Sequence, residues 1–174
     1  HDRPVDEVRV SNALRSADWL AYAAADDLTN ADTSELGGEE VGGLLTGLES
    51  FWTLDEASGT RADSHGSNDL ADNGSVGSAD GIVGDAADFS GSNYLSHADN
   101  SSLSAGDAAL TFSCWFYIDS AGTSTVAGKH DGASNAGSEW FLYTQGDRLK
   151  ITVYSGSSDV LTVAADSFGD LSTG

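Results

Sequence analysis

The sequence has few of the residues that build several common kinds of site. Its 174 residues include one cysteine, one proline and no methionine, and 7 Lys and Arg stand against 28 Asp and Glu, for a formal net charge of −21. A single cysteine excludes an intrachain disulfide and a cysteine-based metal site. So few cations do not suit nucleic acid or anionic membranes, which both need clustered Lys and Arg.

Long apolar runs are also missing. No stretch approaches the roughly 20 apolar residues of a membrane span, so we expect no membrane insertion. An acidic surface keeps a protein soluble, attracts divalent cations and suits a salty medium. We therefore expect an extracellular, cell-surface or virion-surface protein in a saline environment, although a solvated acidic surface without further meaning is equally compatible. The chain begins at His1 and lacks methionine, and we expect it to be a piece of a longer protein.

The abundant residues predict an all-β fold. Glycine occurs 21 times beside many Ser, Asp and Asn, which suits short strands joined by tight turns and argues against a helix bundle. Short strands at this spacing predict an antiparallel β-sandwich or jelly roll. The predicted strands lie at 51–54, 86–89, 94–96, 110–118, 126–129, 140–144, 149–154 and 160–164, with a polar loop at 63–72.

The first 47 residues have a different pattern. Residues 5–10 alternate apolar and polar side chains, as a half-buried strand does. Ser16 is a good N-cap for an Ala-rich helix at 17–25, with Asp18 in its first turn. Residues 31–47 are polar and glycine-rich, which predicts a linker that ends near Gly47.

The strand predicted at 110–118 has two distinct faces, because side chains alternate along a strand. Its inner row consists of Leu110, Phe112, Cys114, Phe116 and Ile118. This row makes Cys114 a small buried hydrophobic residue rather than a nucleophile. Trp115 and Tyr117 lie on the opposite face, which is either covered by another segment or lines a concave surface.

Several motifs in succession resemble one family. They are Phe51–Thr60 (FWTLDEASGT), Ala62–Gly66 (ADSHG), Gly84–Leu95 (GDAADFSGSNYL) and Leu110–Asp119 (LTFSCWFYID). In order and spacing they resemble laminin-G-like, concanavalin A-like lectin/glucanase jelly-roll modules from about Leu48 to Val163. Residues 5–19 are similar to the last strand and closing helix of such a module.

The resemblance implies a composite domain organisation. Residues 1–30 would be the closing strand and helix of one module, 31–47 a linker, and 48–174 the front portion of a second jelly roll. The family pattern continues beyond Gly174 with a Trp-led strand and several more. We expect those strands to come from unseen sequence or from a neighbouring chain, as in strand exchange.

Catalysis is not expected. Concanavalin A-like glucanases carry two glutamates at short spacing on one strand, as acid/base chemistry at a sugar requires. Here Asp55 and Glu56 are adjacent and would point to opposite faces. His65, His97 and His130 sit in separate loops without a visible Ser or Cys partner, so we predict no catalytic residues and no enzyme.

One loop is a candidate calcium site. Calcium prefers several oxygen ligands on a flexible loop, and Asp63, Asn68 and Asp69 supply them. The resemblance adds Asp6, since the closing strand lies near that loop in family members, many of which bind a structural Ca²⁺. The alternative is a solvated turn whose Asp and Asn side chains cap backbone groups.

The aromatic residues predict a ligand surface. Sugar sites use exposed aromatic rings beside polar groups, which makes Trp115, Tyr117, Trp140 and Tyr143 candidates. The alternative is that these rings are core residues.

The preferred function is therefore non-catalytic adhesion or recognition of a glycan or cell-surface protein by a large extracellular or virion surface protein. A structural repeat of a filament, sheath or capsid decoration, in which copies bind one another, is the alternative. A carbohydrate-binding domain of a glycoside hydrolase is a third compatible role.

Overall fold

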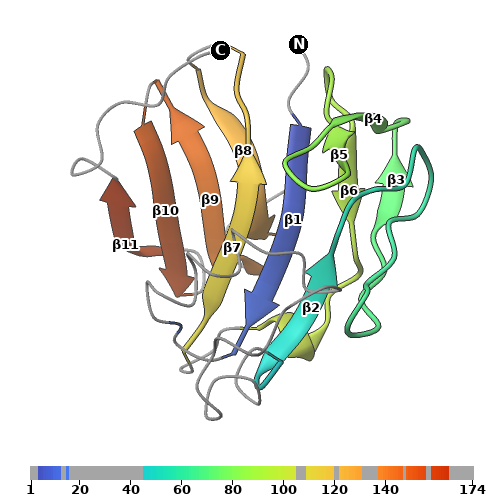
Figure 1. Ribbon diagram of the computed structural model, residues 1–174. Coiled ribbons are helices and arrows are strands. Elements are labelled where there is room, and N and C mark those ends of the chain that lie inside the picture. Colours follow the sequence, from blue (N-terminus) through green and yellow to red (C-terminus); the bar gives the residue numbers. More distant parts are fainter. Residues whose placement is uncertain are drawn as a thin grey trace, which may run out of the picture.

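The computed structural model describes residues 4–12, 15, 45–104, 109–119, 122–130, 137–146, 148–155 and 158–164. Figure 1 shows that strands dominate this part of the chain. In chain order they are β1 (Pro4–Ser11), β2 (Leu48–Trp52), β3 (Ala71–Asn73), β4 (Gly77–Asp80), β5 (Asp85–Asp88), β6 (Tyr94–Ser96), β7 (Thr111–Phe116), β8 (Ser124–Lys129), β9 (Trp140–Gln145), β10 (Arg148–Ser155) and β11 (Ser158–Ala164). A 3-10 turn covers Ser101–Leu103.

The strands form two main antiparallel sheets and one small pair. The first sheet runs β2-β1-β5-β4, with β7 also paired to β1. The second sheet runs β11-β10-β9-β8, and β3 pairs with β6. Phe112 of β7 and Trp140 of β9 bring their ring centroids to 5.4 Å, which joins the two sheets through their side chains. The fold is therefore all-β, antiparallel and sandwich-like.

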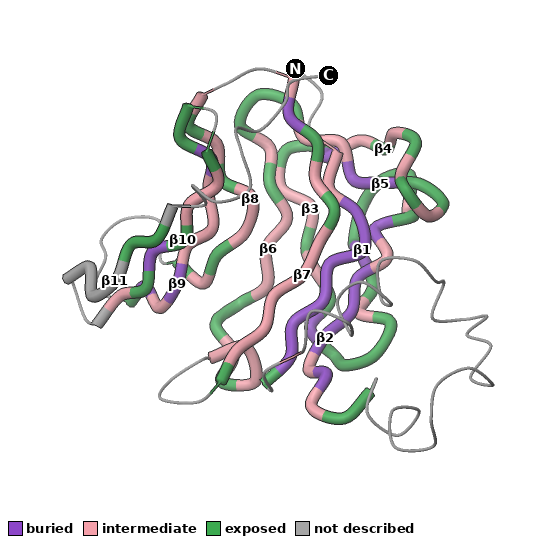
Figure 2. Tube along the Cα trace, turned by 60° about the vertical axis from the view of Figure 1, so that its left-hand side comes forward, coloured by how far each residue is buried: buried purple, intermediate pink, exposed green. Residues whose placement is uncertain are grey.

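Strand β1 lies in the middle of the first sheet. One side of it pairs with β2 and β5, and the other side pairs with β7. Residues 6–11 are all buried, and Figure 2 shows β1 buried along most of its length. The strand predicted from alternation is confirmed, but its predicted half-exposure is wrong. A bulge at Glu7, whose φ is 51°, interrupts the alternation, and both faces of the strand are covered.

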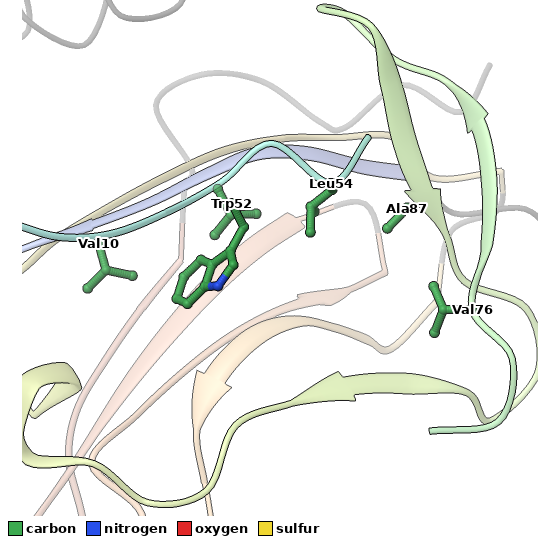
Figure 3. Close-up of a cluster of buried hydrophobic side chains, with 6 residues drawn as sticks. Val10, Trp52, Leu54, Val76 and Ala87 are labelled. Atoms are coloured by element: carbon green, nitrogen blue, oxygen red, sulfur yellow. The ribbon is translucent and has the colours of Figure 1, made fainter. Parts of the chain in front are cut away.

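The core lies beneath β1 and β2. Figure 3 shows Trp52 and Leu54 pointing from this layer toward the strands opposite. The buried cluster consists of Val8, Val10, Trp52, Leu54, Val76 and Ala87, and Leu110, Phe112 and Cys114 pack against it. This packing agrees with the predicted inner row of β7. Burial raises the pKa of the Cys114 thiol to about 12, so this residue is a neutral thiol at neutral pH.

The predicted all-β class is confirmed, and each predicted strand overlaps an observed one. The short strands β3 and β4 were not predicted, because they lack the β-branched and aromatic residues that mark strands. The predicted helix at 17–25 and most of the predicted linker at 31–47 lie outside the described residues. In the described part of the chain, no helix has the length and apolar character needed to cross a membrane.

Candidate functional site

Strand β9 places its aromatic residues on two opposite faces. Trp140 is 6% exposed and packs on Phe112 between the layers. Phe141 and Tyr143, being odd-numbered neighbours, lie on the other face with Gln145. Their rings are stacked, with centroids 5.1 Å apart and an interplanar angle of 26°. The outer face of the second sheet therefore carries a pair of stacked aromatic rings.

Two more rings extend this pair across neighbouring strands. His130, which directly follows β8, lies 5.2 Å from the Phe141 ring centroid. It also lies 6.4 Å from the ring centroid of Tyr154 on β10. We call His130, Phe141, Tyr143 and Tyr154 the aromatic face. It is continuous across three adjacent strands of one sheet.

A glycine lets the Phe141 ring lie close to the sheet. Gly128 of β8 is the Cα partner of Phe141 in the β8–β9 ladder. A Cβ built on Gly128 would lie 2.8 Å from Cδ2 of Phe141, which is too close for two carbon atoms. Any larger residue at position 128 would therefore push the ring away from its present position.

Polar side chains border the aromatic face. Lys150 of β10 is the Cα partner of Tyr143, so the two side chains share a face. Lys150 Nζ donates a hydrogen bond to Oε1 of Gln145 at 2.6 Å. An amide and an ammonium thus stand next to the Tyr143 ring, where they can bond to hydroxyl or carboxylate groups of a ligand.

The four aromatic residues predicted as ligand-binding do not form one surface. Tyr143 belongs to the aromatic face. Trp115 and Tyr117 are 39% and 44% exposed and lie along β7 and just beyond it, in the first sheet. Trp140 lies in the interior. Phe141, His130 and Tyr154 were missed, although the alternation of β9 would have paired Tyr143 with Phe141 rather than with Trp140.

The predicted calcium loop is organised by the carboxylate of Asp63. Its Oδ1 accepts hydrogen bonds from the backbone N–H groups of Phe51, His65 and Gly66, at 3.0, 3.1 and 2.8 Å. Its Oδ2 accepts from the N–H of Asn68 at 3.0 Å. Burial raises the pKa of Asp63, but the hydrogen bonds to its carboxylate outweigh burial and hold that pKa below its ordinary value.

The other predicted calcium ligands are also engaged. Asn68 is buried, and its Oδ1 accepts a hydrogen bond from Asn100 Nδ2 at 2.6 Å. Asp69 Oδ1 accepts from the N–H of Asp63 at 2.8 Å. These oxygens therefore accept hydrogen bonds within the loop and from Asn100, and calcium binding by the loop stays a prediction.

Asp6 belongs to a different part of the fold. Its Oδ2 accepts from the N–H groups of Ile82 and Val83, at 2.8 and 3.1 Å. Oδ1 is buried without a hydrogen-bond partner among the described residues. Burial is the main cause that raises the pKa of Asp6. Among the described residues no group of three or more His, Cys, Asp or Glu side chains is placed to hold a metal, so calcium binding stays a prediction from the resemblance.

A buried arginine supports the neighbouring loops. Arg61 has no exposed surface, and its guanidinium donates to the carbonyls of Gly59, Val76 and Gly77 at 2.6, 3.1 and 3.1 Å. These bonds tie the chain before β4 to the turn at Gly59. Sequence reasoning did not single out Arg61, because its partners are backbone carbonyls that no sequence pattern reveals.

The acidic residues considered for catalysis have structural partners. Asp55 Oδ1 accepts from the N–H of Asp85 at 2.8 Å, and Glu56 Oε1 accepts from the N–H of Ala62 at 2.7 Å. Glu139 lies 2.9 Å from Lys129 Nζ, which also lies 3.0 Å from Asp99. Burial lowers the pKa of Lys129, but its bonds to Glu139 and Asp99 outweigh burial and raise that pKa above its usual range.

Comparison with known proteins adds no relative to this picture. No family model, curated protein or solved structure matches the chain. The aromatic face with its polar border and the resemblance seen in the sequence motifs are therefore the features that bear on function.

Proposed function

We propose that this protein is a non-catalytic, laminin-G-like jelly-roll module of an extracellular or virion surface protein that recognises a carbohydrate through the aromatic face. The resemblance supports the family and the extracellular setting. The stacking of Phe141 on Tyr143 supports the ligand class. Fold alone would not indicate a ligand, because such modules carry many functions.

The stacked pair of rings carries the proposal. A sugar ring presents an apolar face of C–H groups that packs on an aromatic ring, while its hydroxyls seek hydrogen-bonding partners at the edge. Phe141 and Tyr143 supply the rings, and Lys150 and Gln145 supply the polar edge. A sugar with a carboxylate would gain most from Lys150, because an ion-assisted hydrogen bond is stronger than a neutral one.

The test begins with a glycan array, with and without Ca²⁺, followed by calorimetric titration of the best binder. Tyr143→Ala and Phe141→Ala should each weaken binding by roughly tenfold or more, since each removes a stacking surface. Trp115→Ala is the matched control. It removes an exposed ring of the first sheet and should leave the affinity unchanged.

Two results would contradict the proposal. Loss of binding in Trp115→Ala with full binding in Tyr143→Ala would move the site to β7. Absence of binding to any glycan by a correctly folded protein would remove the carbohydrate altogether. Circular dichroism of every variant establishes folding before binding is compared.

A specific observation also favours the alternative, a structural repeat whose copies bind one another. Ile151, Val153 and Val163 are exposed although they lie on the same face of the second sheet as Leu142 and Trp140. Exposed apolar residues grouped on one face commonly mark a protein–protein contact. Sedimentation of the wild-type chain and of Val163→Lys over a range of concentrations tests this role, which predicts association in the first and its loss in the second.

A further inference from the structure

The central strand β1 is joined to its neighbour β2 by an unusually long connection. The two strands are antiparallel, and the backbone N–H of Asn12 donates to the carbonyl of Gly47 at 2.9 Å. Ends this close can be joined by a two-residue hairpin turn. Here residues 13–46 join them instead. The first sheet therefore does not require that β1 be delivered by the same chain.

Strand β1 is also what holds the first sheet together. It pairs with β2 and β5 on one side and with β7 on the other, and no direct ladder joins β7 to β2 or β5 among the described strands. Without β1, a slot with unpaired N–H and C=O groups would separate β7 from the rest. Such a slot accepts one strand of matching length and pattern.

The charged residues of β1 travel with the strand. Arg9 and Glu7 are buried, and Arg9 Nη2 lies 2.5 Å from Glu7 Oε2 within the same strand. The Arg9 guanidinium also lies 4.4 Å above the ring centroid of Phe51 on β2. A β1 strand from another copy would bring its own ion pair and find the same Phe51 ring. Its contacts in the slot would equal those of the resident strand.

The geometry points to β1 as an exchangeable strand, which a second copy of this chain can insert into the slot between β7 and the β2–β5 side of the first sheet. The occupant is the β1 strand of that copy, because its sequence and register already fit. Within this connection, the backbone N–H of Arg15 donates to Thr111 Oγ1, and its guanidinium donates to the carbonyl of Thr46. An extended chain as long as the remaining residues 16–44 still spans roughly 100 Å, more than the width of a domain of this size. The connection is therefore long enough to reach a neighbour.

Chain concentration decides whether β1 stays in the sheet of its own chain or inserts into the sheet of another copy. Because the contacts are equal, exchange competes with closure at the effective concentration that the linker imposes, which lies in the millimolar range. A dilute chain closes on itself, whereas copies held close together exchange strands. Release of β1 breaks ladders on both of its sides, so exchange proceeds through unfolding and refolding.

Cysteine pairs across the β1–β7 ladder test the inference in the full-length chain. Ser11 and Thr111 are Cα partners in that ladder. Both are substituted by cysteine, Ser11→Cys in one copy and Thr111→Cys in another, on a Cys114→Ala background. The two copies are mixed, unfolded, refolded together at rising concentration, and oxidised. Disulfide-linked pairs should increase with concentration. When chain concentration equals the effective concentration, about half of the chains should be exchanged, and about a quarter should be disulfide-linked, because only mixed pairs carry both cysteines.

A matched control and a second readout complete the test. Tyr143 and Lys150 are Cα partners across β9 and β10, and the connection between these two strands is short. A mixture of Tyr143→Cys copies and Lys150→Cys copies should therefore give only collisional cross-links. Native mass spectrometry of unsubstituted chains, refolded at high concentration, should show dimers that persist on dilution. Cross-links in the Ser11→Cys/Thr111→Cys mixture no more frequent than the control, or unsubstituted chains that remain monomeric, would overturn the inference.

Discussion

The two sheets differ in where their side chains find contacts. In the first sheet and its loops, the side chains of Arg61 and Asp63 find their partners inside the protein. Arg61 donates to three carbonyls and Asp63 accepts four N–H groups. In the second sheet, the aromatic face lies on one side. On the opposite side, which also carries Trp140, the side chains of Ile151, Val153 and Val163 are exposed to solvent. The first region directs these polar side chains inward, whereas the second presents surface that a partner could use.

The comparison predicts that stability depends on the first region and binding on the second. Substitutions of the same kind should therefore lower the free energy of unfolding strongly in the first region and weakly in the second. Two of the four predictions below compare matched substitutions in the two regions, and the other two concern carboxylates of the first region. Each is measured as the free energy of unfolding in urea unless stated otherwise.

Arg61→Ala should have the largest effect, a loss of about 3 kcal/mol or more, because it leaves a cavity and removes the donor of three carbonyls. Arg148→Ala, which changes an exposed arginine of β10, should change stability by less than about 0.5 kcal/mol. Equal costs at the two positions would contradict the contrast between the regions.

Asp63→Asn should cost about 1–3 kcal/mol at pH 7, since an amide nitrogen cannot accept the N–H bond that one carboxylate oxygen now accepts. The pKa of Asp63 is lowered by folding, so its contribution is present above the ordinary value of 3.8 and is lost as the pH falls through the folded value. The difference in the free energy of unfolding between wild type and Asp63→Asn should therefore become smaller in acid. A gap that stays constant down to pH 2 would be inconsistent with this origin.

Valine-to-threonine substitutions give the most closely matched pair. Val76 is 1% exposed in the first region, and Val163 is 47% exposed in β11. Val76→Thr buries a hydroxyl and should cost about 1–3 kcal/mol, whereas Val163→Thr should change stability by less than about 0.5 kcal/mol. A large cost for Val163→Thr would show that its side chain is covered in solution, for example by another copy.

Asp6→Asn should change stability least of the four, and it should stabilise the protein where the other substitutions destabilise it. Burial raises the pKa of Asp6, so the proton binds more tightly in the folded state. That contribution to stability is present below the ordinary value of 3.8 and is lost as the pH rises through the folded value. The neutral amide should therefore raise the melting temperature at pH 7, with the difference vanishing in strong acid. A lower melting temperature at pH 7 would indicate that the ionised form is stabilised, for instance by a bound cation.

The sequence was sufficient for the fold class and for most strands, because their apolar alternation is a local signal. It failed where contacts are distant in sequence. Residues 5–10 alternate as a half-exposed strand does, yet residues 6–11 of β1 are all buried. Val8 and Val10 lie in the core, and Asp6 accepts hydrogen bonds from the turn at Ile82–Val83. Nothing in the alternation shows a second layer over the polar side.

The candidate site was found only in part. The ring of Tyr143 stacks on that of Phe141 in the aromatic face, and its role in ligand binding stays a prediction. Trp140 was grouped with it although the two are three positions apart, an odd offset that places them on opposite faces of a strand. The contribution of His130 and Tyr154 depends on strand neighbours, and strand order cannot be read from a single sequence.

Gly128 has one more consequence, which concerns how such a surface can change over time. The residue contributes no chemistry to a ligand, yet its missing side chain determines how near the Phe141 ring lies to the sheet. A single codon change to alanine would displace that ring without altering any side chain of the aromatic face. Selection for a differently shaped ligand can therefore act on Gly128 in β8, which is not part of the aromatic face, while every residue of that face stays the same.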